Sequence, residues 1–158
     1  MKYYMKSKLF KTKEDFWIQN EENKEIFFID NKLFTFGLQF DLIKDDKVLY
    51  SVKETVISLL AKYEVKESSE IVAEVNKKPA FRKKSVKIES KYGDLYVKGD
   101  ILDYNYDIYK DNKKIAKIYK EVFPFTDSYN VDIDFEDEAF VLTLAVIVDD
   151  IIDKQINK

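Results

Sequence analysis

Apolar residues occur along the chain in pairs at alternate positions, and the pairs return at a nearly constant interval. Such alternation is typical of a β-strand with one buried face, because successive side chains point to opposite sides of a sheet. The intervals between pairs are 24, 23, 23, 20 and 23 residues. The six pairs are Phe16/Ile18, Phe40/Leu42, Tyr63/Val65, Val86/Ile88, Tyr106/Ile108 and Tyr129/Val131.

A polar turn and a second apolar stretch follow most of these pairs. FWIQ is followed by NEENK and EIFFI, FDLI by KDD and KVLYSV, and YDIY by KDNKK and IAKIY. Each unit is typical of a β-hairpin. Six hairpins predict about twelve antiparallel strands in a barrel or sandwich. A leucine-rich solenoid has a similar period, but its ladder of leucine and asparagine is absent here.

The C-terminal segment DEAFVLTLAVIVDDIIDKQ has a different pattern. Residues 139–148 form the longest apolar run, interrupted only by Thr143. A run of this length, apolar on all sides, favours a buried helix. The β-branched residues in it favour a strand, so both alternatives stay open. If the helix is correct, Asp149, Asp150 and Asp153 are expected where it emerges into water.

The two predicted parts agree in size. A helix of about 16 residues is about 24 Å long, and strands of 6–8 residues span about 20–26 Å. A barrel of about twelve strands leaves a lumen near the diameter of one helix, about 10 Å. We therefore predict a mainly β fold, a closed antiparallel barrel of about twelve strands enclosing a hydrophobic C-terminal helix. No linker-like segment divides residues 1–158, which predicts a single domain.

Composition excludes several kinds of chemistry. The chain of 158 residues has no Cys and no His, and its only glycines are Gly37, Gly93 and Gly99. It therefore lacks a thiolate nucleophile, an imidazole base and the glycine-rich loops that bind nucleotides. The sequence predicts a protein that is not an enzyme and has no cofactor or metal site. A net charge of −3 argues against nucleic acid as a partner.

The N-terminal segment MKYYMKSKLFKTKEDFW has no continuous apolar stretch and no small-residue cleavage site. The ten-residue apolar run at 139–148 is shorter than the ~20 residues of a membrane-spanning helix. We therefore expect a cytoplasmic protein that does not cross a membrane.

The segment KKPAFRKKSVK is the strongest candidate for ligand binding. It holds six cations around Phe81, and each cation near an anionic membrane contributes about 1 kcal/mol of attraction. Solvated lysines that protect strand edges from aggregation are the plainer interpretation. The residues assigned to an anion or lipid site are Lys77, Lys78, Arg82, Lys83 and Lys84, with Lys87 beside them.

Carboxylates cluster before the predicted helix, at Asp132, Asp134, Glu136, Asp137 and Glu138. Alternating carboxylates are typical of a calcium loop, but the glycine and the distal glutamate of such a loop are absent. Favourable interaction of acids with a helix N-terminus explains the same residues more simply.

Tyrosines on the predicted strands form a possible platform for a base or a sugar, at Tyr104, Tyr106, Tyr109 and Tyr119. The simpler interpretation is barrel packing with the hydroxyls at the surface. Trp17 is expected in the core or at its rim for the same reason.

Four segments together resemble the bacterial LURP-one-related proteins of the tubby C-terminal-like superfamily: MKYYMKSKLF, WIQNEENKEIFFIDNKLFTFGLQFDLI, GDILDYNYDIYKDNKKIAKI and DEAFVLTLAVIVDDII. The resemblance covers almost the whole chain and depends on strands and turns. It implies a twelve-stranded barrel around a C-terminal helix. It also implies two functional themes of the superfamily, phosphoinositide binding by tubby domains and a membrane-linked role for phospholipid scramblases.

Two functional hypotheses follow. The first is a non-enzymatic binding module that attaches to an anionic membrane surface or a phosphorylated ligand through the segment around Phe81. The second is a protein-interaction or scaffold domain that uses a strand edge or an aromatic patch.

Overall fold

The structure is a computed structural model that describes residues 1–6, 15–32, 37–57, 60–76, 85–120 and 128–156. The described residues include twelve strands, a 3₁₀ turn, η2 (Ile101–Asp103), and the helix α2 (Glu138–Ile156). The strands are β1 (Lys2–Lys6), β2 (Phe16–Asn20), β3 (Glu25–Asn31), β4 (Gln39–Lys44), β5 (Lys47–Ile57), β6 (Leu60–Glu67), β7 (Glu70–Asn76), β8 (Ser85–Ser90), β9 (Gly93–Asp100), β10 (Asn105–Lys110), β11 (Lys113–Lys120) and β12 (Ser128–Ile133).

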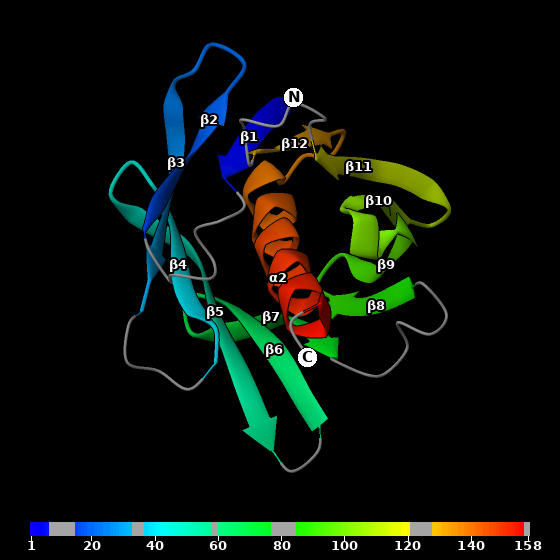
Figure 1. The fold of residues 1–158 in the computed structure, drawn as a ribbon. Coiled ribbons are helices and arrows are strands. Elements are labelled where there is room, and N and C mark those ends of the chain that lie inside the picture. The colour runs from blue at the N-terminus through cyan, green and yellow to red at the C-terminus, as the bar shows by residue number, and fades with distance from the viewer. Residues whose placement is uncertain (7–14, 33–36, 58–59, 77–84, 121–127, 157–158) are drawn as a thin grey trace.

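The strands form one closed barrel in which neighbours along the chain are neighbours in space, and β12 pairs with β1 to complete the circle. Every pairing is antiparallel. The helix α2 runs through the middle of the barrel (Figure 1). The predicted fold class is therefore confirmed.

The hairpin count differs from the expectation. Five apolar pairs begin hairpins, from β2–β3 to β10–β11, but the sixth pair lies in β12, which α2 follows. The prediction of a sixth hairpin is wrong, because the segment after β12 is helical. The free side of β12 pairs instead with β1, with Tyr3 opposite Val131 and Met5 opposite Tyr129.

Alternation along each strand divides the barrel into an inner apolar face and an outer polar face. In β3, for example, Phe27 and Ile29 are buried while Ile26 and Phe28 are partly exposed. The tight turns between hairpin strands need a left-handed backbone, which short polar residues adopt at low cost. Positive φ angles occur at Asn23, Asp45, Asp46, Ser68, Ser69, Asp111 and Asn112.

The helix α2 is buried on all sides, and Phe140, Leu144 and Val148 are among its fully buried residues. Its β-branched residues do not make it a strand, for a physical reason. A strand inside a closed barrel has no neighbour for its backbone N–H and C=O groups, whereas a helix pairs these groups within itself. No helix within the described ranges is long and apolar enough to cross a lipid bilayer.

Replacing Leu144 with Asp tests the buried helix. Leu144 has 0% exposure, and an unpaired charge at such a site is expected to lower the free energy of unfolding by at least about 4 kcal/mol. Urea denaturation measures the change. In the control Val48→Asp, at a residue that is 53% exposed, the change should stay within about 0.5 kcal/mol. A Leu144→Asp protein as stable as the parent would contradict the position of α2.

Candidate functional site

The five residues assigned to an anion or lipid site, Lys77, Lys78, Arg82, Lys83 and Lys84, lie outside the described residues. The described neighbours are Asn76, which ends β7, and Ser85, which begins β8. The assignment therefore stays a prediction. Lys87 lies on β8 and is exposed, with its Nζ 3.5 Å from Asp94 Oδ2.

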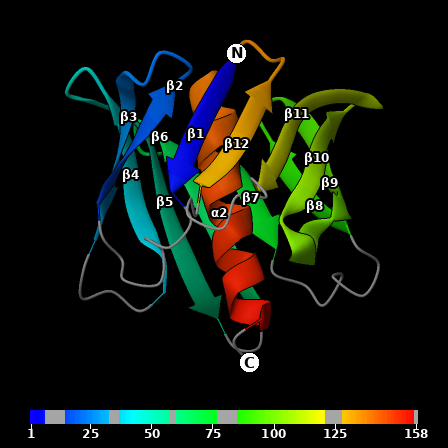
Figure 2. The same ribbon diagram turned by 45° about the horizontal axis from the view of Figure 1, so that its top comes forward.

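The segments that connect successive strands alternate between the two rims of the barrel. Because all neighbouring strands are antiparallel, the links after odd-numbered strands lie at one rim and the links after even-numbered strands at the other. We call the rim where α2 begins the upper rim and the rim where α2 ends the lower rim, as Figure 2 shows them.

The sequence distributes charge unequally between these two sets of connections. The upper-rim connections contain the lysines Lys24 and Lys91 and the acids Glu21, Glu22, Asp45, Asp46, Asp111, Asp134, Glu136 and Asp137. The lower-rim connections contain the cations Lys8, Lys11, Lys13, Lys32, Lys77, Lys78, Arg82, Lys83, Lys84 and Lys158 and the acids Glu14, Asp15, Asp103, Glu121 and Asp127. The segments that follow even-numbered strands are therefore mainly acidic in sequence, and those that follow odd-numbered strands are mainly basic.

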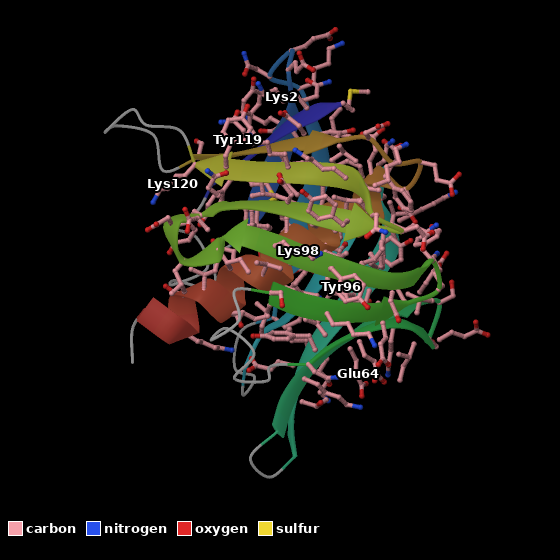
Figure 3. The ribbon with its side chains drawn as sticks, turned by 90° about the vertical axis from the view of Figure 1, so that its right-hand side faces the viewer. Lys2, Glu64, Tyr96, Lys98, Tyr119 and Lys120 are labelled. Carbon is pink, nitrogen blue, oxygen red and sulfur yellow. The ribbon has the colours of Figure 1, made fainter. Side chains whose placement is uncertain are left out.

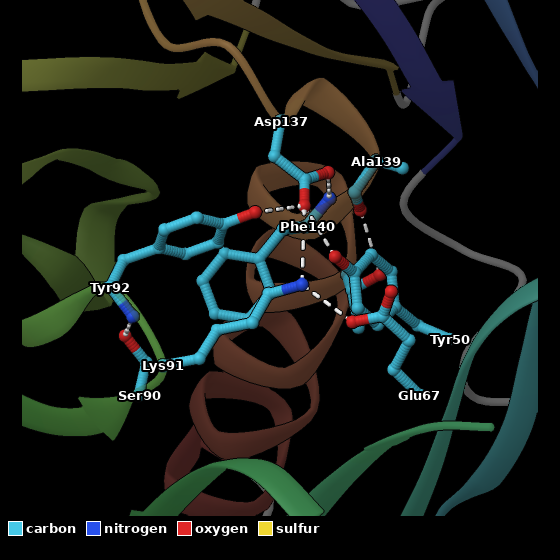
Figure 4. Close-up of polar contacts among 9 residues, drawn as sticks. Tyr50, Glu67, Ser90, Lys91, Tyr92, Asp137, Ala139 and Phe140 are labelled. Carbon is cyan, nitrogen blue, oxygen red and sulfur yellow. Dashed lines mark hydrogen bonds and ion pairs between the residues drawn. The ribbon is translucent and has the colours of Figure 1, made fainter. Parts of the chain in front are cut away.

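At the upper rim, Asp137 organises a polar cluster around the start of α2 (Figure 4). Its Oδ1 accepts the backbone N–H of Phe140 at 3.0 Å, which caps the helix. Its Oδ2 accepts the hydroxyls of Tyr50 and Tyr92, the latter at 2.5 Å. Burial and the bond to Asp137 raise the pKa of both tyrosines, so the hydroxyls remain donors. This geometry confirms the helix-capping interpretation for Asp137.

Lys91 completes the upper cluster. Its Nζ lies 2.5 Å from Glu67 Oε2 and 3.9 Å from Asp137 Oδ2, and 5.3 and 5.0 Å from the ring centres of Tyr50 and Tyr92. The described residues contain no group of three or more carboxylates that could hold a metal ion. The hydrogen bonds of Asp137 to Tyr50, Tyr92 and Phe140 attach the start of α2 to β5 and to the turn between β8 and β9.

A second cluster lies inside the lower half of the barrel. The expectation that Asp149 and Asp150 emerge into water is wrong, since they are 5% and 9% exposed. The helix continues past them, with Ile151 and Ile152 fully buried. In the sequence, the apolar residues Ile151 and Ile152 directly after Asp149 and Asp150 were the signal that these two acids are buried.

Each of these buried carboxylates has a tyrosine partner. The Tyr129 hydroxyl donates to Asp149, and the Tyr63 hydroxyl donates to Asp150 at 2.6 Å. Lys154, four residues after Asp150, lies 2.7 Å from it.

Lys154 also binds Glu54 on β5, which links the helix to a neighbouring strand. Glu54 is buried, and its Oε2 also accepts the backbone N–H of Leu38 at 2.9 Å. The pair therefore ties the end of α2 to β5 and to the segment before β4.

Asp149 binds a proton near neutral pH. Burial, together with the nearby charges of Asp153 and Asp150, raises its pKa to about 7, although the hydrogen bond from Tyr129 and the charge of Lys120 oppose the rise. Tyr106 faces the same carboxylate, and burial and that charge raise its pKa well above the usual value.

The four tyrosines of the predicted platform do not form one surface. Tyr106 is buried in the core, so the expectation of a surface hydroxyl is wrong for it. Tyr104 is half-buried and packs on Tyr129 at 5.4 Å between ring centres. Tyr109 and Tyr119 lie on the outer face, beside the lysines described next.

Lysines cover the outer rings on one side of the barrel (Figure 3). Lys2 and Lys117 lie 5.8 and 5.7 Å from the ring centre of Tyr119, and Lys98 lies 5.7 and 5.6 Å from those of Tyr96 and Tyr109. The same three lysines belong to a cross-strand row of alternating charge, which consists of Lys2, Asp132, Lys117, Asp107 and Lys98. Opposite charges in register stabilise neighbouring strands, which gives this face a structural role.

Trp17 is not a core residue. It is 44% exposed on the outer face of β2, where its ring centre lies 4.9 Å from that of Phe28. The pair covers part of the outer surface of the β2–β3 hairpin.

Comparisons with known proteins show a family, a relative and a solved structure to which this chain is similar. The model of the LURP-one-related family matches residues 1–149. The uncharacterised protein YxjI of Bacillus subtilis (strain 168) is 26% identical over 150 residues, which cover 94% of this chain and 91% of YxjI. The X-ray structure of a protein from Arabidopsis thaliana matches with a TM-score of 0.64 at 15% identity, covering 95% of this chain and 91% of that one. The last likeness concerns the fold alone.

Asp149→Asn tests the proton-binding carboxyl. In the parent, an unfolded aspartate loses its proton near pH 3.8, whereas folded Asp149 keeps it to about pH 7. The unfolded state therefore binds fewer protons in this window, and stability falls as pH rises through it, by about 4 kcal/mol in total. The variant should lack this loss, so its stability relative to the parent should increase from pH 4 to pH 7.

Urea denaturation at several pH values measures this difference. The control is Asp46→Asn, at an exposed turn residue whose positive φ suits Asn. Its stability should follow the parent at every pH. Parallel curves for Asp149→Asn and the parent would show that Asp149 is ionised throughout and would contradict its raised pKa.

Asp137→Ala removes the cap and leaves two tyrosine hydroxyls without their acceptor. The free energy of unfolding is expected to fall by about 2–4 kcal/mol, measured by thermal or urea denaturation. The matched control Asp134→Ala removes an exposed carboxylate that precedes the same helix, and it should cost about 0.5 kcal/mol or less. Equal losses in the two variants would show that general electrostatics, and not the cap, stabilises α2.

Proposed function

The chain belongs to the LURP-one-related family, and on that premise we propose that it is a cytoplasmic, non-enzymatic binding module that attaches to an anionic membrane surface through its lower rim. This proposal is carried by a difference in sequence charge between the segments that follow odd-numbered strands and those that follow even-numbered strands. Ten cations and five carboxylates belong to the lower-rim connections, against two lysines and eight carboxylates at the upper rim.

A charge difference along the barrel axis favours one orientation at a membrane. The cytoplasmic leaflet is negative, and each nearby cation contributes about 1 kcal/mol of attraction. The acidic upper rim is repelled by the same surface and points away from it. Five cations of the lower set, Lys77, Lys78, Arg82, Lys83 and Lys84, lie within eight consecutive residues, which concentrates the attraction.

The phenylalanine content of the lower-rim connections also supports membrane attachment at this rim. Six of the twelve phenylalanines of the chain belong to the lower-rim connections, and they are Phe10, Phe34, Phe36, Phe81, Phe123 and Phe125. Cations combined with large apolar residues are the composition of segments that bind at a bilayer interface. Because the net charge of the whole chain is only −3, a general electrostatic attraction to nucleic acid has no basis.

The strand-edge form of the protein-interaction hypothesis has less support. Each of the twelve described strands pairs with a neighbour on both sides, so none of them offers a wholly unpaired edge for a partner strand.

Co-sedimentation with vesicles tests the proposal. The parent should bind vesicles that contain anionic lipid and not neutral ones, and high salt should release it, because ions screen the attraction. Changing Lys77, Lys78, Lys83 and Lys84 to Glu should weaken binding by more than about a hundredfold. The matched control changes Lys24, Lys44, Lys47 and Lys113 to Glu, which alters the net charge equally at the upper rim and should leave most of the binding intact.

Three results would count against membrane attachment. The first is no binding to any vesicle. The second is equal loss in both charge-reversed proteins, which would show a response to net charge alone. The third is competition by millimolar inorganic phosphate at constant ionic strength, which would identify a site for a soluble phosphorylated ligand.

A further inference from the structure

A cavity opens at the upper rim, beside the start of α2 and opposite the proposed membrane side. Its volume is about 500 Å³, within the range of small-molecule sites. Its walls combine the aromatic rings of Tyr3, Phe27 and Tyr92 with carboxylates of Glu136 and Glu138 and one cation, Lys44.

Two of these rings belong to the apolar core and border the cavity with little exposed surface, since Tyr3 is 5% and Phe27 is 3% exposed. Tyr3 and Phe27 lie edge to face, with ring centres 5.6 Å apart. The faces of aromatic rings carry partial negative charge and attract cations within about 6 Å. Aromatic walls also favour a guest with methyl or methylene groups, which gain by leaving water.

The charge of the lining favours a cation as well. Glu136, Asp137 and Glu138 contribute three carboxylates, whereas Lys44 is the one cation among the described lining residues. The Oε2 atom of Glu138 is buried without a hydrogen-bond partner, although the Glu138 carboxylate also interacts with Tyr3, whose pKa is raised by burial and by this carboxylate. The helix N-terminus would attract an anion, but Asp137 already supplies that negative charge as the cap.

Two lysines of the chain already make cation–π contacts with rings of this cavity. Lys44 Nζ lies 5.5 Å from the ring centre of Phe27, and Lys91 Nζ lies 5.0 Å from that of Tyr92. Lys44 is exposed, so its side chain is free to move from Phe27 into water. These contacts indicate that an ammonium group is a suitable partner for these rings.

We propose that this cavity binds a small alkylammonium cation, with Phe27 and Tyr3 contacting its methyl or methylene groups and Glu136 and Glu138 facing its charge. Lys44 occupies the face of Phe27 in the unliganded protein and moves aside on binding. This site is independent of membrane attachment, because it lies at the other rim and uses none of the lysines assigned there.

Nuclear magnetic resonance titration of the full chain tests this site with choline as the probe. The comparison ligand is 3,3-dimethyl-1-butanol, which has the shape of choline without its charge, and sodium chloride controls for ionic strength. Choline should shift the resonances of Tyr3, Phe27 and Ala139, and the neutral alcohol should bind about tenfold more weakly.

Two substitutions at exposed positions should change the affinity in opposite directions. Lys44→Ala frees the face of Phe27 and removes a repelling charge, so choline should bind several-fold more tightly. Glu136→Gln removes an attracting charge and should weaken binding several-fold. The control Glu22→Gln, in the β2–β3 turn of the same rim, should bind like the parent. Thermal unfolding of each variant verifies that the fold is intact.

Opposite shifts in the two variants, together with preference for choline over the alcohol, would support the cation site. Absence of choline binding at tens of millimolar, or equal binding of choline and the alcohol, would overturn the proposal. So would an unchanged affinity in both variants. None of these results depends on the vesicle assay, because neither the ligands nor the substitutions involve the lower rim.

Discussion

The apolar contact between α2 and the inner face of the barrel is the interaction on which the rest of the structure depends. Barrels of eight strands are filled by their own side chains, whereas much larger ones enclose water. With twelve strands, the inward side chains of this barrel leave a lumen that another apolar element must fill, and a helix that is apolar on all sides must be buried on all sides. Residues such as Phe140, Leu144 and Val148 meet inward residues of the strands with no exposed surface left. Neither element buries its apolar surface without the other.

Apolar contact alone does not determine how far the helix sits along the barrel axis, and the polar clusters supply this register. The Tyr50–Asp137 and Tyr63–Asp150 hydrogen bonds each join residues 87 positions apart. The two aspartates are separated by about 20 Å of helix. A shift of α2 by one turn in either direction would break both hydrogen bonds and would move one of the two carboxylates deeper into the apolar lumen without a donor, at a high cost in free energy. The same clusters therefore position the start and the end of the helix.

The two rims have different chemistry because the chain returns to each rim after every second strand. Acidic and basic connections are interspersed along the sequence, and the net charge is small. The antiparallel order gathers the described acidic turns at the start of α2, and the proposed function assigns the basic connections to the opposite rim. The proposed membrane surface and the proposed cation cavity thus lie on opposite ends of one rigid scaffold. Such a separation would let one module hold a membrane and a ligand at the same time.

Local pattern was enough to predict five of the hairpins with their turns, because alternation and turn chemistry are properties of short segments. The match in size between a barrel and a helix then favoured the helix over a strand and gave the fold class. The resemblance to the family added support over nearly the whole chain. Three features were decided only by tertiary structure. The pairing of β1 with β12 joins the two ends of the barrel sheet, and no local pattern specifies a contact at that separation.

The burial of Asp149 and Asp150 depends on what surrounds the helix, namely Tyr129, Tyr63 and Lys154, which come from distant parts of the chain or the next helical turn. The meeting of Tyr3, Phe27 and Glu138 around one cavity likewise joins three elements far apart in sequence. A residue type indicates which chemistry is available, but burial and neighbours determine its charge, its partners and its access to a ligand. Sequence by itself therefore determined the elements of this protein, and the closure of the barrel decided which side chains act together.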